Sequence, residues 1–419
     1  MTEAMARAIA AQLLACAARS GRSEDQRASL IELPTLVLQL AHAIARQRYL
    51  PQPFTVFAVT DPKLREIFAP AYLDRLVHHW LIGHIEPWWD RRFIDDSYAN
   101  RSGKGTQAAI ERLQRFMRQP GHRWYCQLDI RAFFPSIDRA RLLALWRAAL
   151  PRLPHPPATL ALLDHVASAI LQQDPTQPAP TPSGQVALLR QVPPHKSLFH
   201  AAPGRGLPIG SLTSQFFANV YLNELDQFAK HTLKVRAYLR YVDDFVLLAD
   251  DPATLLGWKA RIEDFLQERL GLQLHPSKTV LQRSGQGVDF LGSIVYPHHR
   301  LTRARSVRAL YRRLAWFQWL VYGQGPGPAT AAAPPGGSWL RWLAQHQALY
   351  APGEPTPALL VRMLATINSY YGVFAHANTW RLRQHIYHER LGTLQRFFLP
   401  DGPGYRHLKI RKAWQMPRW

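Results

Sequence analysis

Residues 237–249 read Ala-Tyr-Leu-Arg-Tyr-Val-Asp-Asp-Phe-Val-Leu-Leu-Ala, and this stretch decides the fold. Two apolar, strand-like runs, 237–242 and 245–249, flank the adjacent carboxylates Asp243 and Asp244, which predicts a hairpin with both acids at its tip. Carboxylates at such a tip are costly unless water or a cation meets them, and hard divalent cations prefer carboxylate oxygens. Aspartate is also a common turn residue, so the pair alone leaves ordinary turn chemistry open.

The composition indicates a protein of two or three subdomains with a polyanionic partner. The chain has 419 residues, of which 47% are hydrophobic, enough to bury a substantial interior. Its 51 Lys and Arg against 29 Asp and Glu give a formal net charge of +22. This excess predicts binding to phosphates that weakens as salt rises. A membrane surface is the other polyanion, but no run of about 18 apolar residues is present, so we expect no membrane span.

The chain has only two cysteines, Cys16 and Cys126. Without a Cys-x-x-Cys pair or a Cys/His pattern, neither a disulfide framework nor a zinc site is expected, and Cys126 is predicted to be a small buried residue. Residues 1–18 are rich in alanine and interrupted by polar side chains. This pattern favours a short amphipathic helix over a signal peptide, so we expect a cytoplasmic protein.

Two stretches rich in helix-breaking residues interrupt the predicted elements. Residues 151–200 are rich in proline, which predicts an extended or mobile insertion, and residues 323–338 read as a flexible linker. Between them, residues 303–321 predict an amphipathic helix. Its apolar face comprises Leu310, Leu314, Phe317 and Val321, and a separate stripe comprises Arg305, Arg308 and Arg312. The arginine stripe fits phosphate contact or an ordinary solvated face.

A third carboxylate can join the pair at the hairpin. Residues 124–128 predict a buried strand that ends in Asp129, which lies 114 residues before Asp243. Acids from neighbouring strands of one sheet can hold two Mg²⁺ ions about 3.5–4 Å apart. Such a pair activates a 3′-hydroxyl and stabilises a leaving pyrophosphate. Spacing alone does not establish that these acids converge.

Several motifs resemble those of bacterial reverse transcriptases. Residues 129–138, Asp-Ile-Arg-Ala-Phe-Phe-Pro-Ser-Ile-Asp, resemble the family's first catalytic-aspartate motif, and residues 241–244, Tyr-Val-Asp-Asp, resemble its second. Residues 206–210, Gly-Leu-Pro-Ile-Gly, stand where the family places its nucleotide-pocket motif. Further matches follow in the family's order at residues 63–65, 274–279 and 290–292.

The resemblance covers roughly residues 54–296 and implies an α+β, right-hand polymerase fold. Its parts would be fingers, a palm with an antiparallel sheet, and a helical thumb. The implied segments are an N-terminal helical extension (1–53), fingers (54–122), palm (123–296, with the proline-rich insertion 151–200), and thumb with a C-terminal extension (297–419).

The resemblance also implies a catalytic centre. Asp129 and Asp243 would be the principal ligands of two Mg²⁺ ions, or of Mn²⁺, with Asp244 as the neighbouring acid and Ile130 also at the metal site. Lys278 matches a lysine that acts as general acid for pyrophosphate. From the residues alone, Lys278 is also compatible with being an ordinary loop lysine.

Substrate contacts are implied in the same way. Lys63 and Arg65 would meet the incoming triphosphate, and the ring of Phe134 would clash with a 2′-hydroxyl and select deoxynucleotides. By pattern alone, Lys63 and Arg65 are surface residues and Phe134 is a core ring. The nucleotide pocket would include Arg205, Gly206 and Gln215, and the primer grip would include Phe290, Leu291 and Gly292.

The nucleotide-pocket motif narrows the resemblance. Arg205-Gly206 stands where many reverse transcriptases carry Gln-Gly, and residues 210–215 give a Gly-x-x-x-Ser-Gln pattern. This pattern resembles the enzymes of diversity-generating retroelements, which are error-prone, and a related set of antiphage-defence enzymes. The proline-rich insertion and the long C-terminal part favour the defence-associated group. Implied partners are a structured non-coding template RNA, an RNA–DNA hybrid, dNTPs, and an accessory protein or second polymerase subunit.

Two other functions remain as alternatives. A catalytically idle RNA-binding scaffold is disfavoured by the intact aspartates, and an RNA-dependent RNA polymerase is disfavoured by Phe134.

Residues 101–106, Arg-Ser-Gly-Lys-Gly-Thr, do not form a phosphate loop, because Tyr98 stands where glycine is required and Gly105 follows the lysine. They predict a glycine turn that leads into a helix near Thr106.

Overall fold

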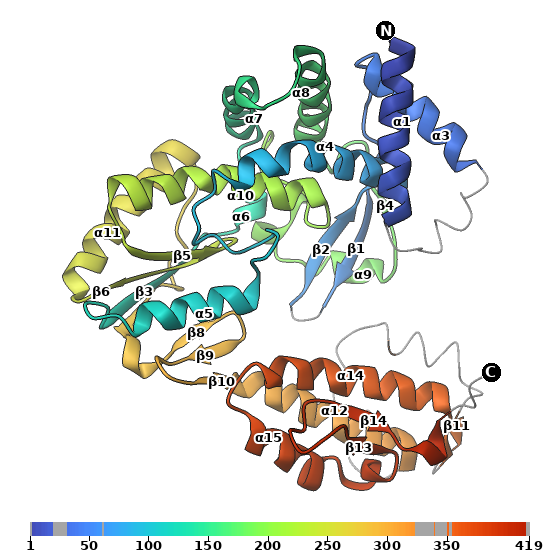
Figure 1. Cartoon of the computed structure of the whole chain (residues 1–419), viewed down its shortest axis with the longest axis vertical. Coiled ribbons are helices and arrows are strands. Elements are labelled where there is room, and N and C mark those ends of the chain that lie inside the picture. Colours follow the sequence, from blue (N-terminus) through green and yellow to red (C-terminus); the bar gives the residue numbers. More distant parts are fainter. Residues whose placement is uncertain are drawn as a thin grey trace. The chain divides into compact units, whose positions relative to one another are not determined.

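The computed structural model describes residues 2–19, 32–60, 63–322, 339, 350–351 and 354–415. The chain forms two compact units (Figure 1). Unit 1 comprises Met1–Ala109 and Gly121–Gln282, and unit 2 comprises Ile110–Pro120 and Arg283–Trp419. Both contain helices and strands, which confirms the α+β expectation. The boundaries of the four predicted segments stay a prediction, and the predicted linker at 323–338 lies outside the described residues.

A four-stranded sheet in the order β5-β6-β3-β7 forms the centre of unit 1. β6 pairs antiparallel with both β5 and β3. β5 and β6 are the two arms of the predicted hairpin, joined by a two-residue turn. The strands are β3 (Trp124–Asp129), β5 (Ala237–Tyr241), β6 (Asp244–Ala249) and β7 (Val280–Arg283).

Helices pack around this sheet into one continuous core. Helix α11 contacts β3 and β6, whereas α10 contacts α4 and α7. α10 is buried on nearly every side, and its buried residues include polar ones such as Asn219 and Asp226. Unit 1 contains α1 (Thr2–Arg19), α3 (Leu33–Ala45), α4 (Tyr72–Asp90), the start of α5 (Thr106–Met117), α6 (Phe133–Ser136), α7 (Arg139–Ala149), α8 (Pro157–Gln172), α9 (Val186–Leu189), α10 (Leu212–Gln227) and α11 (Pro252–Phe265).

The proline-rich insertion is more ordered than predicted. Its first half forms α8, whose buried residues join the core of unit 1, so the expectation of extended chain was wrong there. Pro157 lies in the first turn of this helix, where proline costs no hydrogen bond. Farther along, β4 (Thr181–Pro182) pairs parallel with β1 (Thr55–Val59), which itself pairs antiparallel with β2 (Arg65–Ala69). The insertion is therefore part of the fold.

Unit 2 has a core of its own, built on two long helices, α12 (Ala304–Tyr322) and α14 (Pro357–Ala375). The predicted amphipathic helix is confirmed as α12: its four apolar residues are buried and its three arginines are exposed. The remaining elements are β8 (Val288–Phe290), β9 (Ser293–Val295), β10 (Arg300–Thr302), β11 (Tyr350–Ala351), β12 (Glu354–Pro355), α15 (Trp380–His385), β13 (Phe398–Pro400) and β14 (Leu408–Ile410).

One helix among the described residues, α14, has the length and apolar composition of a membrane-spanning segment, which the sequence analysis did not anticipate. Its residues Leu360, Met363 and Ile367 are fully buried in the core of unit 2. A buried core helix passes the same test of length and composition, so this finding is weak evidence for a membrane span.

Candidate active site

Three aspartates meet at one edge of the four-stranded sheet. Asp129 ends β3 and Asp244 begins β6, and the two are directly opposite each other in the antiparallel pair, so they share a face of the sheet. Asp243 lies in the turn before β6, and its carbonyl oxygen accepts a hydrogen bond from the Ile130 main-chain nitrogen at 3.2 Å. The end of β3 is thus tied to the hairpin tip. The convergence that spacing alone could not establish is present.

The turn itself adopts an unfavourable backbone conformation. Val242 has φ +56°, in the left-handed region that β-branched residues rarely enter. Such a conformation costs about 1–3 kcal/mol and persists only where the surroundings enforce it. The enforcing contact comes from Arg240, whose Nη1 donates to the Val242 carbonyl oxygen at 2.9 Å.

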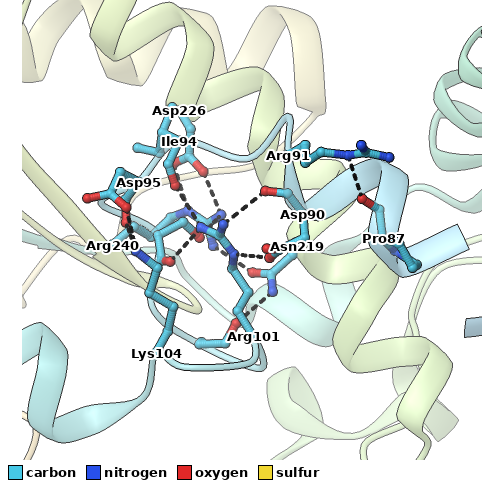
Figure 2. A network of polar contacts seen from close by, with 12 residues as sticks. Pro87, Asp90, Arg91, Ile94, Asp95, Arg101, Lys104, Asn219, Asp226 and Arg240 are labelled. Atoms are coloured by element: carbon cyan, nitrogen blue, oxygen red, sulfur yellow. Dashed lines mark hydrogen bonds and ion pairs between the residues drawn. The ribbon is translucent and has the colours of Figure 1, made fainter. Parts of the chain in front are cut away.

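Arg240 lies at the centre of a buried polar network (Figure 2). Its guanidinium forms a two-pronged ion pair with Asp226 of α10, with Nε–Oδ1 at 2.8 Å and Nη2–Oδ2 at 2.6 Å, and both side chains are 0% exposed. It also donates to Asn219 Oδ1 at 3.2 Å and to Ser97 Oγ at 3.1 Å. Burial alone lowers the pKa of Arg240, but the Asp226 carboxylate more than offsets this and raises it. Arg240 is therefore held in its charged form.

The network extends into the segment before α5. The Arg240 main-chain nitrogen donates to the Asp96 carbonyl at 2.9 Å, and its carbonyl accepts from the Tyr98 nitrogen at 3.0 Å. Arg101 then donates to the carbonyls of Ile94 and Ser97 at 2.7 and 2.9 Å (Figure 2). The glycine turn predicted at 101–106 does lead into α5. Arg101, which lies in this turn, is hydrogen-bonded to the main chain of the segment just before it.

The electrostatics at the tip are those of crowded carboxylates. Burial and the negative charge of Asp129 raise the pKa of Asp243 to about 6, while Lys278 and Arg65 act in the opposite direction. Lys278 Nζ lies 2.6 Å from Asp129 Oδ1. The Gln127 amide nitrogen donates to both Asp244 oxygens, at 3.0 and 3.2 Å. Asp129 and Asp243 therefore act as a repelling pair, while Asp244 is held by a neutral donor.

A divalent cation fits this donor set. Burial and the nearby Asp129 carboxylate raise the pKa of Asp243, and a bound cation would offset both effects. Carboxylate oxygens are also the ligands that Mg²⁺ prefers. Within the described residues no three His, Cys, Asp or Glu side chains already form a metal-binding group, and the Lys278 ammonium contacts Asp129. Asp129 and Asp243 are the residues that would hold a metal.

The predicted triphosphate residues lie at the start of β2. Arg65 opens the strand, is exposed, and lies close enough for its charge to lower the pKa of Asp243. Lys63 precedes it and is also exposed. The structure thus brings Arg65 toward the aspartates, while contact of either residue with a triphosphate stays a prediction.

The nucleotide-pocket motif runs beside Phe134. Leu207 donates to the Phe134 carbonyl at 3.0 Å, and Gly206 donates to the Ile137 carbonyl at 2.7 Å. Gly206 has φ +95°, and a Cβ there would lie 2.5 Å from the side chain of Leu198, so glycine is required. Phe134 is half-buried and packs edge-on against Phe133. Its role as a sugar filter stays a prediction.

Two further pocket residues have different surroundings. Arg205 donates to the carbonyls of Ser136 and Gly271 at 3.1 and 3.0 Å, so its guanidinium is engaged by main chain. Gln215 is exposed and lines a cavity of about 400 Å³ that also contacts α1 and α4. None of the three aspartates lines that cavity. Substrate binding by Arg205 and Gln215 stays a prediction.

The predicted primer grip is a tight hairpin in unit 2. Leu291 and Gly292 join β8 to β9 with φ of +49° and +95°, the pattern of a two-residue turn that matches strand twist. Phe290 is fully buried. Grip function stays a prediction.

Several residues that shape the site were missed from sequence. Arg240 stood in an otherwise apolar strand, whereas Asp226 stood in a helix of mixed polar and apolar residues and gave no comparable signal. A charge at a buried strand position signals a buried partner, because an unpaired charge there is too costly. Gln127 gave a weaker signal, since it interrupts the apolar run before Asp129.

Comparisons with known proteins identify the family. A family model described as reverse transcriptase (RNA-dependent DNA polymerase) matches residues 60–295. Protein YkfC of Escherichia coli K12 is 26% identical over 303 residues, which cover 62% of this chain and 68% of that protein. The group II intron-encoded protein LtrA of Lactococcus lactis subsp. cremoris is 21% identical over 331 residues, which cover 64% of this chain and 50% of that protein.

A solved structure of telomerase from Candida albicans with a fragment of telomeric RNA aligns over 81% of this chain and 58% of that one. It has 12% identity and a TM-score of 0.42. This chain thus spans about half the length of LtrA. The family model covers more than half of the chain, including the three aspartates, and supports the right-hand polymerase fold. The chain belongs to the reverse transcriptase family.

Proposed function

We propose that this chain is an RNA-directed DNA polymerase that copies a structured non-coding RNA into DNA. The observation that carries this proposal is the meeting of Asp129 and Asp243 at one edge of the sheet, inside the segment that matches the family. Burial, and after it the negative charge of Asp129, raise the pKa of Asp243, so positive charge bound between the two acids would be favourable. An RNA–DNA hybrid and dNTPs would be its ligands, and the net charge of +22 suits them.

The proposed mechanism is two-metal nucleotidyl transfer. A pair of Mg²⁺ or Mn²⁺ ions supplies, when bound, the charge that activates a primer 3′-hydroxyl and stabilises the leaving pyrophosphate. Asp129 and Asp243 would hold the ions, and Gln127 would keep Asp244 oriented beside them. Lys278, which contacts Asp129, would give a proton to the leaving pyrophosphate.

Two residues would position the incoming nucleotide. Arg65 offers a planar fork of donors for phosphate oxygens, and its charge already reaches Asp243. Phe134 lies five residues after Asp129 beside the nucleotide-pocket motif, where its ring would exclude a 2′-hydroxyl. This pair would fix the triphosphate and the sugar from opposite ends.

For the biological setting we propose antiphage defence in the cytoplasm, with an accessory protein or second polymerase subunit as partner. The insertion at 151–200 and the long C-terminal part support this proposal, whereas the Gly-x-x-x-Ser-Gln segment at 210–215 resembles both groups. An error-prone enzyme of a diversity-generating retroelement is the alternative. Sequencing of the DNA product separates the two, because substitutions confined to template adenines indicate diversity generation and repetitive or non-genomic DNA indicates defence.

Primer extension by the purified chain tests the activity. With Mg²⁺, dNTPs and an RNA template, we expect DNA synthesis by the wild type and none by Asp243→Asn combined with Asp244→Asn. Asp264→Asn, a matched change at an exposed position of α11, should retain full synthesis. Undiminished synthesis by the double variant would show that the assignment is wrong. RNA binding without synthesis by the wild type would instead indicate a scaffold.

A further inference from the structure

A basic pocket of about 430 Å³ lies beside the end of β3 in unit 1. Three chain segments line it, residues 131–136, 194–205 and 267–273. The lining includes the cationic or imidazole side chains Arg131, Arg205, His195 and His200, whereas no aspartate or glutamate lines it among the described residues. A pocket with several donors of one charge sign and no carboxylate is suited to a compact anion.

The pocket is separate from the predicted triphosphate contacts but close to the catalytic strand. Neither Arg65 nor any of the three aspartates lines it. Arg131 nevertheless follows Asp129 by two residues, and its main-chain nitrogen donates to the carbonyl of Gln273 at 2.8 Å. The carbonyl of Asp129 accepts from His275 two residues farther along, also at 2.8 Å. Two main-chain hydrogen bonds therefore join the segment of Asp129 and Arg131 to the segment of Gln273 and His275, which links the pocket wall to the proposed metal-binding residue Asp129.

The side chains that face the pocket are mostly not paired with carboxylates within the described part of the chain. Arg131, His195 and His200 are exposed and have no ion-pair partner within the described part of the chain. The carboxylate near His200 is Glu66, which is buried and already accepts hydrogen bonds from Ser197 and Leu198.

Arg205 differs because it is fixed by two carbonyls. Its Nη2 lies 4.0 Å from an oxygen of Asp138, which does not line the pocket. The pocket therefore combines one rigid guanidinium with cationic and imidazole groups that remain available to a ligand.

We propose that this pocket binds a pyrophosphate group, supplied either by the product of nucleotide addition or by the triphosphate of a free nucleotide. The proposal rests on the proposed function, since addition at Asp129 and Asp243 would release pyrophosphate close to Arg131. A planar guanidinium binds two phosphate oxygens at once, and the imidazoles and the side-chain amides of Gln267 and Gln273 add donors around it. The pocket would take the anion away from the catalytic carboxylates.

Binding of radiolabelled inorganic pyrophosphate to the full chain by equilibrium dialysis tests the proposal. EDTA is present, so that metal-dependent binding at the aspartates does not contribute. We expect saturable binding that Arg131→Gln weakens about 10-fold or more, as expected for one lost charged hydrogen-bonding group. Arg131→Lys should have a pyrophosphate affinity between those of the wild type and Arg131→Gln, because lysine keeps the positive charge but lacks the planar fork of donors. Arg236→Gln, at an exposed position before β5, should bind as the wild type does.

Competitors distinguish the sources of the anion. Stronger displacement by pyrophosphate than by dATP indicates a product site, and equal displacement indicates that a triphosphate binds there too; both support the proposal. Wild-type affinity in Arg131→Gln, or displacement by a DNA oligonucleotide but not by excess unlabelled pyrophosphate, overturns it.

The outcome is independent of the polymerase assignment. Asp243→Asn should abolish synthesis and leave metal-free pyrophosphate binding intact. If the wild type binds pyrophosphate specifically but makes no DNA, the pocket proposal stands and the proposed polymerase function is rejected. If it makes DNA normally but does not bind pyrophosphate, the pocket proposal is rejected and the polymerase function stands.

Discussion

Replacing Arg240 by methionine should destabilise unit 1 and distort the turn that carries Val242 and Asp243. The change leaves the fully buried Asp226 carboxylate with a single strong donor, the Tyr238 hydroxyl at 2.7 Å. Breaking a buried ion pair by removing one partner costs about 3–5 kcal/mol, because the remaining charge is uncompensated. For a unit of this size, each kcal/mol lowers the melting temperature by roughly 2–4 °C, so we expect a decrease of roughly 6–20 °C.

The assays are thermal and chemical unfolding of the full chain, both followed by circular dichroism, with primer extension measured in parallel. Arg236→Met is the matched control, because it makes the same change at an exposed position just before the same strand, and it should alter stability by less than about 0.5 kcal/mol. Arg240→Met combined with Asp226→Leu removes both charges. We expect this double variant to be more stable than the sum of the single changes predicts, by about 3 kcal/mol.

Two results would refute this reasoning. One is a loss below about 1 kcal/mol in Arg240→Met, which would mean that water or another donor satisfies Asp226. The other is strict additivity in the double variant, which would mean that the two side chains are not energetically coupled. Retention of full synthesis in a folded Arg240→Met protein would separately reject the role of Arg240 at the Val242 carbonyl.

Four further predictions concern the site and its support. Gly210→Ala places a Cβ 2.7 Å from a backbone oxygen at φ +120° and should lower the melting temperature, whereas Gly257→Ala, in open space within α11, should raise stability by about 0.4–1 kcal/mol. Asp243 has a folded-state pKa of about 6, above its ordinary 3.8, so the folded chain binds this proton more tightly and loses stability as pH rises from about 4 to 6. Asp243→Asn should therefore be more stable than the wild type at pH 8 but not at pH 4, in urea unfolding without divalent metal. Lys278→Gln should change stability by less than about 1 kcal/mol, since the lysine is 46% exposed, yet slow single-turnover synthesis by about 10²-fold or more. Gln127→Leu removes the donor to Asp244 and should lower the synthesis rate about 10-fold in the same assay, without loss of folded protein.

The local sequence pattern was sufficient to predict the strands that carry or border the three aspartates. The alternation around the hairpin and the apolar run before Asp129 predicted strands that the structure has, because those side chains occupy a buried sheet whatever surrounds them. The helix at 303–321 was predicted for the same reason, from one apolar stripe. The convergence of the aspartates was not a local property, and only the resemblance to a family supplied it.

The rest required contacts between distant segments. The helix α8 was hidden by its proline-rich neighbourhood, although its buried residues follow the helical period. The pairing of Arg240 with Asp226, 14 residues apart, depends on how α10 packs against the sheet, and no local rule specifies that packing. The basic pocket is similarly assembled from three separate segments.

The buried network and the strained turn are best understood together. A buried ion pair adds little net stability compared with well-packed apolar residues, so its presence next to the turn of Val242 and Asp243 calls for another reason. That reason is geometric: the guanidinium that pairs with Asp226 also holds the Val242 carbonyl, and Val242 is the residue whose backbone is unfavourable. The strain costs about 1–3 kcal/mol, which one charged hydrogen bond of about 1.5–3 kcal/mol can offset. The ion pair therefore fixes the direction in which Asp243 leaves the strand, and a folded variant with an apolar pair at these positions should keep its sheet while losing synthesis.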